Sequence, residues 1–184
     1  PKPVPVVLDI RLPLKEAAFL IEVSRPDILI EKDVGKVPLL GMLDSRMIGQ
    51  AFGNLIKNAT EAIDGREPEL ATESGHILVK ASIKSNTIIV DVIDNGKGLP
   101  RENRQRLLEP YMTTREKGTG LGLAIVRKIV EEHGGTLSLH DAPAEFHGGV
   151  GANIRVTFPI VESKAASPEG EADVELQKVV KHGV

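Results

Sequence analysis

Residues 118–123 read Gly-Thr-Gly-Leu-Gly-Leu and lead directly into a strong helix pattern over residues 119–133. Glycines that open a helix leave backbone N–H groups free to bind an anion, and the helix dipole favours phosphate at the same end. The stretch is not a Walker loop, because no Gly-Lys-Ser or Gly-Lys-Thr follows it. It is not a dinucleotide fingerprint either, because the third glycine of that motif would fall on Leu123. The sequence therefore predicts a phosphate-binding helix start of another kind.

Upstream, a second glycine-rich stretch, Asp-Asn-Gly-Lys-Gly over residues 94–98, follows directly on an apolar strand. A carboxylate at a strand end can accept a hydrogen bond from an exocyclic amine such as that of adenine. The glycines allow the backbone to approach a flat ring closely. Taken alone, the stretch is equally typical of an ordinary turn.

A third polar feature lies on a helix predicted over residues 44–64, where apolar residues recur at spacings of three and four. Asn54, Asn58 and Glu61 stand at i, i+4 and i+7 of this helix, so at about 100° per residue they fall beside its apolar face. Asn carbonyl oxygens are neutral hard ligands, suited to a Mg²⁺ that already holds phosphates and waters. The alternative is that they are ordinary polar residues at the edge of a buried helix.

The rest of the pattern indicates the fold class. Strands are predicted over residues 6–10, 28–32, 76–84, 87–93, 136–140 and 152–158, and a further helix over residues 14–23. Residues 34–41 fit a strand entering a turn, and residues 94–118 form a long turn-rich stretch of the kind that is more often functional than idle. Strands and helices mixed without strict alternation predict an α+β two-layer sandwich, with about three helices on one face of a mixed sheet.

The composition is that of a soluble globular domain. Of the 184 residues, 41% are hydrophobic and only 3% are aromatic, so the core is expected to be aliphatic. The formal charge of −3 gives no electrostatic footprint for nucleic acid. The chain has no cysteine, which excludes disulfides and thiolate metal sites. It also shows no apolar run of about 20 residues and no signal-peptide pattern.

One domain is expected over residues 6–161. Residues 1–5, Pro-Lys-Pro-Val-Pro, cannot be helical and are interpreted as a linker remnant. From residue 162 onward the composition shifts to Ser, Pro, Gly, Glu and Lys, which predicts a flexible C-terminal tail over residues 162–184. A short docking helix over residues 174–181 is the alternative for that tail.

The motifs resemble the four sequence boxes of histidine kinases, in the order and at the spacing of that family. Residues 53–59, Gly-Asn-Leu-Ile-Lys-Asn-Ala, resemble the N box, and residues 94–98 the first glycine box. Residues 109–114, Glu-Pro-Tyr-Met-Thr-Thr, resemble the F box, and residues 118–123 the second glycine box. The match runs from about residue 8 to residue 160 and is most similar to the NtrY-type nitrogen-regulation sensor kinases.

The resemblance implies the Bergerat (GHKL) ATP-binding fold, with ATP and Mg²⁺ as ligands and a mobile lid over the triphosphate. Asp94 would receive the adenine amine, while Asn58 with Asn54 would hold Mg²⁺ and phosphate. Gly96 and Gly98 would shape the base pocket. The remaining ATP-binding residues that it implies, in or beside the lid, are Thr113, Thr114, Arg115, Lys117, Gly118, Thr119, Gly120, Leu121 and Gly122.

Two positions depart from the family pattern. Tyr111 stands where the F box usually has Phe, a change that leaves an aromatic anchor. On the last strand the common Gly-Thr-x-Phe is replaced by Gly-Ala-Asn-Ile over residues 151–154. This replacement puts a contact from that strand to the base in doubt.

Three functions are compatible with these motifs: the catalytic half of a histidine autokinase, a self-sufficient GHKL ATPase or serine kinase, and a degenerate nucleotide-binding module. In the ATPases and serine kinases, a Glu general base typically stands four residues before the metal-binding Asn. Here that position is Asn54, whose amide cannot take a proton, although Glu61 stays open as a base. Asp94 and every motif glycine are intact, which argues against the degenerate module.

The phosphoacceptor of a histidine kinase lies on a long dimerisation helix and is usually followed by Asp or Glu. The five histidines are His76, His133, His140, His147 and His182. Only His140 precedes an Asp, and it ends a predicted strand, where a surface turn is expected. The resemblance therefore implies that this chain presents ATP to a dimerisation domain that it lacks, without phosphorylating itself.

By the same resemblance, the phosphoryl group would pass on to a response regulator of NtrX type in a bacterial two-component system. The chain is expected to be the cytoplasmic part of an inner-membrane parent. No contact of this chain with nucleic acid or with the membrane is expected.

Overall fold

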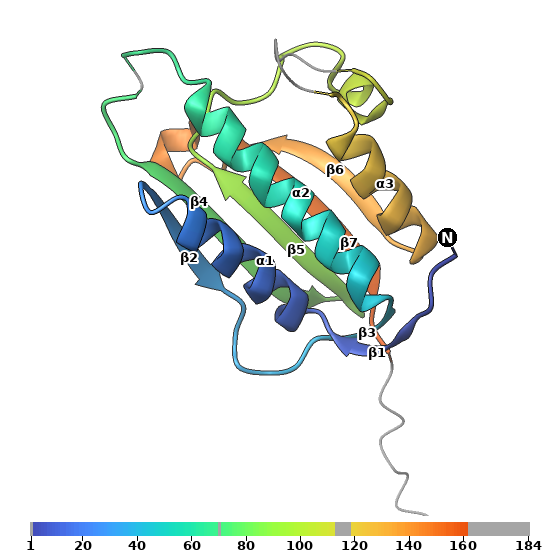
Figure 1. The fold of residues 1–184 in the computed structure, drawn as a ribbon. Helices are drawn as coiled ribbons and strands as arrows, with labels where there is room; N and C mark the ends of the chain where they lie inside the picture. The colour runs from blue at the N-terminus through green and yellow to red at the C-terminus, as the bar shows by residue number, and fades with distance from the viewer. Residues whose placement is uncertain (1, 70, 113–118, 162–184) are drawn as a thin grey trace, which may run out of the picture.

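The computed structural model describes residues 2–69, 71–112 and 119–161, which form two layers: a five-stranded sheet and three helices on one of its faces (Figure 1). The helices are α1 (Arg11–Ser24), α2 (Ser45–Asp64) and α3 (Gly122–Glu132), with two short 3₁₀ helices, η1 (Arg104–Leu108) and η2 (His147–Gly149). The strands are β1 (Val6–Asp9), β2 (Ile28–Asp33), β3 (Leu40–Leu43), β4 (Gly75–Lys84), β5 (Thr87–Asp94), β6 (Thr136–Asp141) and β7 (Ala152–Pro159). The sheet order is β2-β4-β5-β7-β6, and β1 and β3 form a separate antiparallel ribbon.

The sheet is mixed, because β2 and β4 run parallel while the other three pairs run antiparallel. The predicted α+β sandwich is confirmed. No helix in the described part of the chain is long and apolar enough to cross a membrane.

Several element boundaries differ from the predictions. Helix α1 begins at Arg11, before Pro13, because the N–H groups of a first helical turn have no partner within the helix and proline loses nothing there. Helix α3 begins at Gly122 instead of residue 119, and the ambiguous residues 34–41 lead into β3. The 3₁₀ helix η1 lies inside the turn-rich stretch and was not predicted.

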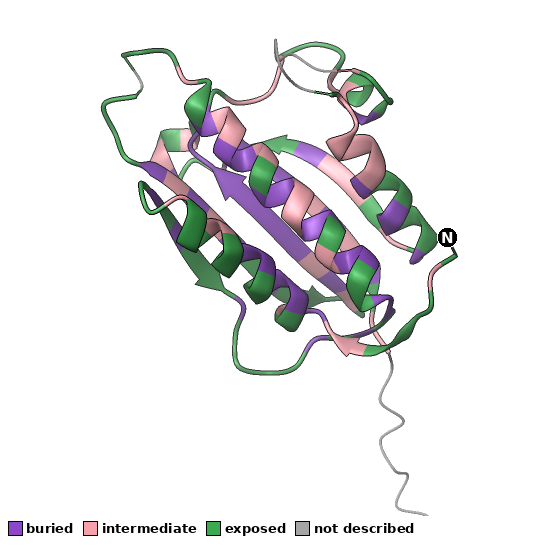
Figure 2. Cartoon of the chain, viewed as in Figure 1, coloured by how far each residue is buried: buried purple, intermediate pink, exposed green. Residues whose placement is uncertain are grey.

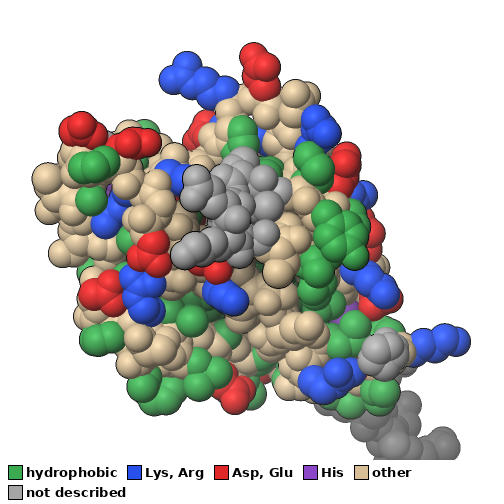
Figure 3. Space-filling model, turned by 45° about the horizontal axis from the view of Figure 1, so that its top comes forward, with side chains coloured by type: hydrophobic (Ala, Val, Ile, Leu, Met, Phe, Trp, Pro, Cys, Tyr) green, Lys and Arg blue, Asp and Glu red, His purple; other side chains and the backbone are tan. Residues whose placement is uncertain are grey.

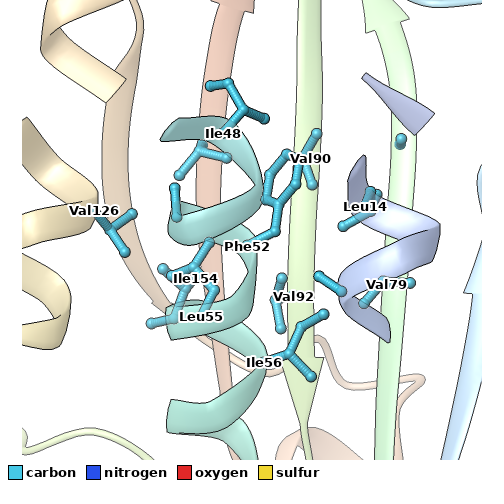
Figure 4. Close-up of a cluster of buried hydrophobic side chains, with 14 of the residues drawn as sticks. Leu14, Ile48, Phe52, Leu55, Ile56, Val79, Val90, Val92, Val126 and Ile154 are labelled. Carbon is cyan, nitrogen blue, oxygen red and sulfur yellow. The ribbon is translucent and has the colours of Figure 1, made fainter. Parts of the chain in front are cut away.

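The core lies between the helices and the sheet, where most buried positions are found (Figure 2). Phe52 of α2 is fully buried and lies beside Val90 of β5 (Figure 4). Side chains from all three helices meet there: Leu14 comes from α1, and Val126 from α3 (Figure 4). The core is aliphatic apart from a few phenylalanines, as the composition predicts.

A buried histidine joins the two helices that will flank the site. Asp44 caps α2 by accepting hydrogen bonds from the N–H groups of Arg46 and Met47 at 3.0 and 3.1 Å. The N–H of Asp44 donates to His133 Nε2 at 3.0 Å, while His133 Nδ1 lies 2.7 Å from the carbonyl oxygen of Ile129. Since a carbonyl can only accept, Nδ1 carries the proton and His133 is neutral. The end of α3 is thereby fixed to the start of α2.

The opposite face of the sheet is covered only in part within the described chain. The segment between β6 and β7, which carries η2, places Ala142 and Phe146 against Ile93 and Leu78. Elsewhere on this face, polar side chains pair with each other across the strands. Arg155, for example, donates to both carboxylate oxygens of Asp91, at 2.8 and 3.0 Å.

Candidate functional site

A cavity of about 360 Å³ opens on the helix side of the sheet, between α2, the start of α3 and the loop after β5. Its polar and charged lining residues are Asn54, Lys57, Asn58, Glu61, Asp94, Lys97 and Thr119. Its apolar lining residues include Leu55, Val92, Leu99, Leu107, Met112, Leu123, Ile125, Ala152 and Ile154. An apolar cleft with a few convergent polar groups is the usual form of a small-molecule site.

Charge is distributed evenly around this side of the molecule. Figure 3 brings the top of Figure 1 forward, and positive and negative side chains are interspersed on the face that it shows. The formal net charge of the chain is −3, so its overall charge does not favour an anion. Within the described chain, Lys57 and Lys97 bring positive charge to the lining of the cavity.

Of the two described acidic residues that line the cavity, Asp94 at the end of β5 is almost fully buried, with 3% of its surface exposed. Its Oδ1 accepts a hydrogen bond from the N–H of Gly96 at 2.8 Å. Burial raises the pKa of Asp94 to about 7, while hydrogen bonds from the N–H groups of Gly96 and Ala152 act in the opposite direction. A desolvated carboxylate of this kind gains much from a donor that a ligand brings, such as an amine N–H.

The two glycines after Asp94 have different roles. A Cβ on Gly96 would lie 2.5 Å from the carbonyl carbon of Ala62, so only glycine lets this turn pack against the backbone of α2. The adjacent N–H of Lys97 donates to the Ala62 carbonyl at 2.9 Å. Gly98 lines the cavity and has a φ of +77°, a conformation that other residues rarely adopt. Gly96 itself does not line the cavity, so its contribution to the pocket is through packing.

The polar side chains beside the apolar face of α2 lie where the helix pattern predicts. Asn54, Asn58 and Glu61 are half-buried and all three line the cavity. The side-chain oxygen and nitrogen of Asn58 lie 3.4 and 3.5 Å from the position of a Cβ on Gly122. The first turn of α3 therefore comes directly against Asn58. Neutral amide oxygens in this place fit a Mg²⁺ whose other ligands are phosphates and waters.

The start of α3 closes the cavity from the other side. Thr119, Gly120, Leu121 and Gly122 line it. Gly120 has a φ of +69°, and a Cβ there would lie 2.6 Å from the backbone of Tyr111. Glycine at this position therefore lets the backbones of two loop segments pack together.

The expectation that Tyr111 is an aromatic anchor is wrong for this structure. Its side chain is 77% exposed and its φ is +64°. The backbone of this residue packs against Gly120, and its ring lies in solvent. Met112 lines the cavity instead, and the buried side chain nearby belongs to Leu108 of η1.

Most of the predicted site residues are placed together. Gly96 packs against α2 without lining the cavity, and the remaining residues lie outside the described part of the chain. Those that line the cavity are Asn54, Asn58, Asp94, Gly98, Thr119, Gly120, Leu121 and Gly122. Those outside the described residues are Thr113, Thr114, Arg115, Lys117 and Gly118.

The altered last strand contributes to the cavity through Ala152 and Ile154. Ala152 presents a methyl group where the family motif has a hydroxyl, so no side-chain hydrogen bond to a base can come from this position. Asn153 points to the opposite face, where its Oδ1 is buried without a hydrogen-bond partner in the described structure. Gly151 was not predicted as a site residue. A Cβ there would lie 1.8 Å from the carbonyl oxygen of Asp94, so the backbone of Gly151 packs directly against the turn that follows Asp94.

Sequence reasoning also missed several lining residues. Lys57 and Lys97 bring positive charge to the cavity, and the apolar contributors Leu99, Leu107, Met112 and Ile125 come from loops and from α3. Lys57 stands between Asn54 and Asn58 on α2, and a helical-wheel count around these residues would have found it. The apolar side chains carry no sequence signal that distinguishes them from the core.

Known proteins resemble this chain in sequence and in fold. Residues 43–162 match the family model for histidine kinase-, DNA gyrase B- and HSP90-like ATPases. Nitrogen regulation protein NtrY of Azorhizobium caulinodans is 45% identical over 171 residues, which cover 93% of this chain and 21% of that protein. The mycobacterial sensor histidine kinase MprB has a TM-score of 0.71 and 27% identity, covering 85% of this chain and 97% of that one. The catalytic domain of histidine kinase ThkA has the same TM-score and 26% identity, with coverages of 85% and 95%.

The chain therefore belongs to the family of histidine kinase-, DNA gyrase B- and HSP90-like ATPases. Within that family it is an ATP-binding catalytic domain of the sensor histidine kinase type, similar to that of NtrY. It spans about a fifth of the length of the NtrY relative.

Proposed function

We propose that the cavity binds Mg·ATP and presents its γ-phosphoryl group to a histidine on a dimerisation domain outside this chain. The observation that carries the proposal is Asp94. Its carboxylate is desolvated at the inner end of the cavity, which α2 and the start of α3 line. The adenine amine would donate to this carboxylate. Gly98 and the apolar side chains of Val92, Leu99 and Ile154 would contact the base.

The phosphates would lie toward the start of α3. N–H groups at a helix start favour anions, and here Gly120 and Gly122 leave the backbone of α3 accessible from the cavity. Asn58, and with it Asn54, would hold Mg²⁺, which when bound neutralises charge on the phosphates. Lys57 adds a positive charge on the same helix. The predicted lid residues would complete this end of the site.

The domain is suited to positioning a phosphoryl group and poorly suited to activating water. Asn54 occupies the place of the general base in the self-sufficient relatives, and its amide cannot accept a proton. Phosphoryl transfer itself depends mainly on alignment and charge stabilisation, which this cavity can provide. An autonomous ATPase is the second candidate, because Glu61 also lines the cavity and is a carboxylate.

No described histidine is placed to receive the phosphoryl group. His76 lies in β4, His133 is buried at the end of α3, and His147 lies in the three-residue η2. His140 and Asp141 are the last residues of β6, paired with Asn153 and Ala152, so the expected surface turn is wrong. Strand β6 stays paired with β7 as far as Asp141, so no turn begins at His140. His182 lies outside the described residues.

By similarity to NtrY, the parent protein would be a sensor kinase that passes the phosphoryl group to a response regulator, for which an NtrX-type protein is the proposed partner. An inner-membrane position of the parent belongs to the same proposal. The predicted linker at residues 1–5 would connect this domain to the dimerisation helices.

Incubation with γ-labelled ATP and Mg²⁺ tests this function. The chain alone is expected to acquire no acid-labile label, and label should appear on a separately supplied polypeptide that carries the dimerisation helices of the same kinase. Steady phosphate release by the chain alone, lost in Glu61→Gln, would instead establish the ATPase. Acid-labile label on the isolated chain would contradict the proposal.

A further inference from the structure

Four titratable side chains form a continuous hydrogen-bonded row on the face of the sheet opposite the cavity. Glu31 Oε2 lies 3.2 Å from His76 Nε2, and His76 Nδ1 lies 2.9 Å from His147 Nε2. His147 Nδ1 in turn lies 2.9 Å from Glu73 Oε2. The four residues, called here the histidine row, come from β2, β4, η2 and the segment that precedes β4.

The number of protons in the histidine row follows from its geometry. Ionised carboxylates only accept hydrogen bonds, so the outer nitrogen of each ring must carry a proton. The contact between the rings needs a third proton, on one of the two inner nitrogens. Two neutral imidazoles supply only two protons, and two imidazolium rings would place two N–H groups against each other. The row is fully hydrogen-bonded only when the two rings share one additional proton.

The protein backbone is arranged to keep the rings in contact. His147 has a φ of +45°, a left-handed conformation that is uncommon for residues other than glycine, and it is followed by Gly148 and Gly149, which also have positive φ. The ring of Phe146 lies 4.8 Å from that of His76 and 4.7 Å from that of His147, measured between centroids. In the described chain no group of three His, Cys, Asp or Glu is arranged to hold a metal ion.

The histidine row is connected to the cavity through the backbone. The N–H of His76 donates to Asn95 Oδ1 at 2.7 Å, and the N–H of Asn95 donates back to the carbonyl of His76 at 3.2 Å. Asn95 also donates from Nδ2 to the carbonyl of Ser74 at 2.9 Å and is 2% exposed. Asn95 directly follows Asp94, so these hydrogen bonds link the backbone of His76 to the turn after Asp94.

A second connection runs through η2. Gly151 follows His147 by four residues, and its backbone packs directly against the carbonyl oxygen of Asp94. The N–H of Ala142 donates to the carbonyl of Gly151 at 3.2 Å and closes this segment. Contact between the two histidines therefore joins the two backbone segments that enclose Asp94, namely the start of β4 and the approach to β7.

We propose that His76 and His147 share one proton beyond those of two neutral rings. They act as positioning residues, which hold the turn after Asp94 in the geometry that binds the nucleotide base. The proposal rests on the assignment of Asp94 to the base made above. Histidine is the side chain that ordinarily changes charge between pH 5 and 8. The row therefore makes nucleotide affinity depend on pH from outside the cavity.

The other described charged groups near the row lie at its edges. The loop before β4 contributes Arg66 and Glu69, which line a shallow depression beside His147 together with Glu73 and Asn95. Farther along β2 and β4, Asp33 and Lys80 form an exposed pair at 3.8 Å. Glu31 and Glu73 are thus the two carboxylates that contact the rings directly.

The test compares variants by calorimetric titration with ADP from pH 5.5 to pH 8. His147→Leu removes the inner contact and is expected to weaken ADP binding about three- to thirtyfold near neutral pH. The difference from the wild type should shrink at pH 5.5, where protonation of both rings separates them in the wild type as well. His147→Gln should recover part of the affinity, because its amide can accept from His76 and donate to Glu73. His140→Leu, an exposed histidine on the same face, is the matched control and should bind like the wild type.

Unchanged ADP binding by His147→Leu at every pH would overturn the proposal. A loss that is independent of pH and that His147→Gln does not restore would also overturn it, since such a loss reflects packing alone. Asp94→Asn is measured in parallel. If this variant binds ADP as the wild type does, the assignment of Asp94 to the base is wrong. The shared proton is then tested by the next measurement.

That measurement needs no nucleotide and reads the ring protons directly. Long-range ¹H–¹⁵N spectra of the wild type should show the two rings taking up protons one after the other, because the second proton meets an opposing N–H. Glu73→Gln, which changes only an exposed carboxylate, should reduce the separation between the two steps. Rings that titrate independently in the wild type would contradict the shared proton even if His147→Leu fails to fold.

Discussion

At the scale of single residues, Asp94 shows how a binding requirement opposes stability. Its carboxylate is almost fully buried and receives hydrogen bonds from backbone N–H groups, but burial still raises its pKa to about 7. A bound base would supply a further donor and stabilise the charged form. Without ligand, the group is one of the places where the fold is under strain from its function.

The pKa of Asp94 makes the stability of the ligand-free protein depend on pH. Below about pH 4 both the folded and the unfolded chain hold the proton, and the group contributes nothing. Between about pH 4 and pH 7 the unfolded chain ionises while the folded chain keeps its proton, so the free energy of unfolding falls as pH rises. Asp94→Asn should therefore be more stable than the wild type at pH 8, by up to about 4 kcal/mol less any hydrogen bond that the amide loses.

Urea unfolding at pH 5 and pH 8 checks this prediction. The advantage of Asp94→Asn should be on the order of 2–3 kcal/mol larger at pH 8 than at pH 5. An advantage that does not change between the two pH values would show that burial does not shift the ionisation of Asp94 in the folded protein.

At the scale of elements, α2 organises the site with both of its faces. One face carries Phe52 and the aliphatic core, and its border carries Asn54 and Asn58 into the cavity. Its C-terminal end receives the glycine turn, through the contact of Gly96 with Ala62 and the hydrogen bond from the N–H of Lys97. The helix thus positions both the amides proposed to bind Mg²⁺ and the turn that carries Asp94.

Gly49 lies within α2 and Gly96 packs against it, and the two should respond in opposite ways to substitution by alanine. Gly96→Ala places a methyl group 2.5 Å from backbone of α2, so it should destabilise the fold by about 1–3 kcal/mol and weaken ADP binding. Gly49→Ala, within α2 and with open space around it, should stabilise by about 0.5–1 kcal/mol because alanine favours helix. Thermal unfolding and calorimetry measure both effects, and equal behaviour of the two variants would contradict this account of Gly96.

The elements that periodicity marks clearly were predictable, and those set by tertiary contacts were not. The regular apolar spacing in residues 44–64 and the alternation in residues 76–93 predicted α2, β4 and β5 closely. The η1 helix has no such pattern, and the backbone contact between Tyr111 and Gly120 is formed only in the folded chain. The same holds for the cavity: Asp94, Asn54 and Asn58 are visible as motif residues, whereas the contact between His76 and His147 joins residues 71 positions apart and leaves no local signal.

At the scale of the whole molecule, one sheet separates two functional faces. The helix side holds the cavity, in which Asp94 lies at the inner end and the start of α3 at the other. The opposite side holds the histidine row, joined to the cavity through Asn95 and Gly151. Under the proposed function the domain is a nucleotide-presenting unit, and the acceptor for the phosphoryl group would come from elsewhere in the parent kinase.

The central claim is that this cavity binds adenine nucleotide through Asp94, and calorimetric titration with ADP at pH 8 tests it most directly. The wild type should bind ADP, with and without Mg²⁺, because the contact to the base does not need the metal. Asp94→Asn should lose at least about a hundredfold in affinity, since the amide removes the charge and presents a donor to the adenine amine. Equal affinity in the wild type and in Asp94→Asn, or no binding by the folded wild type, would contradict the claim.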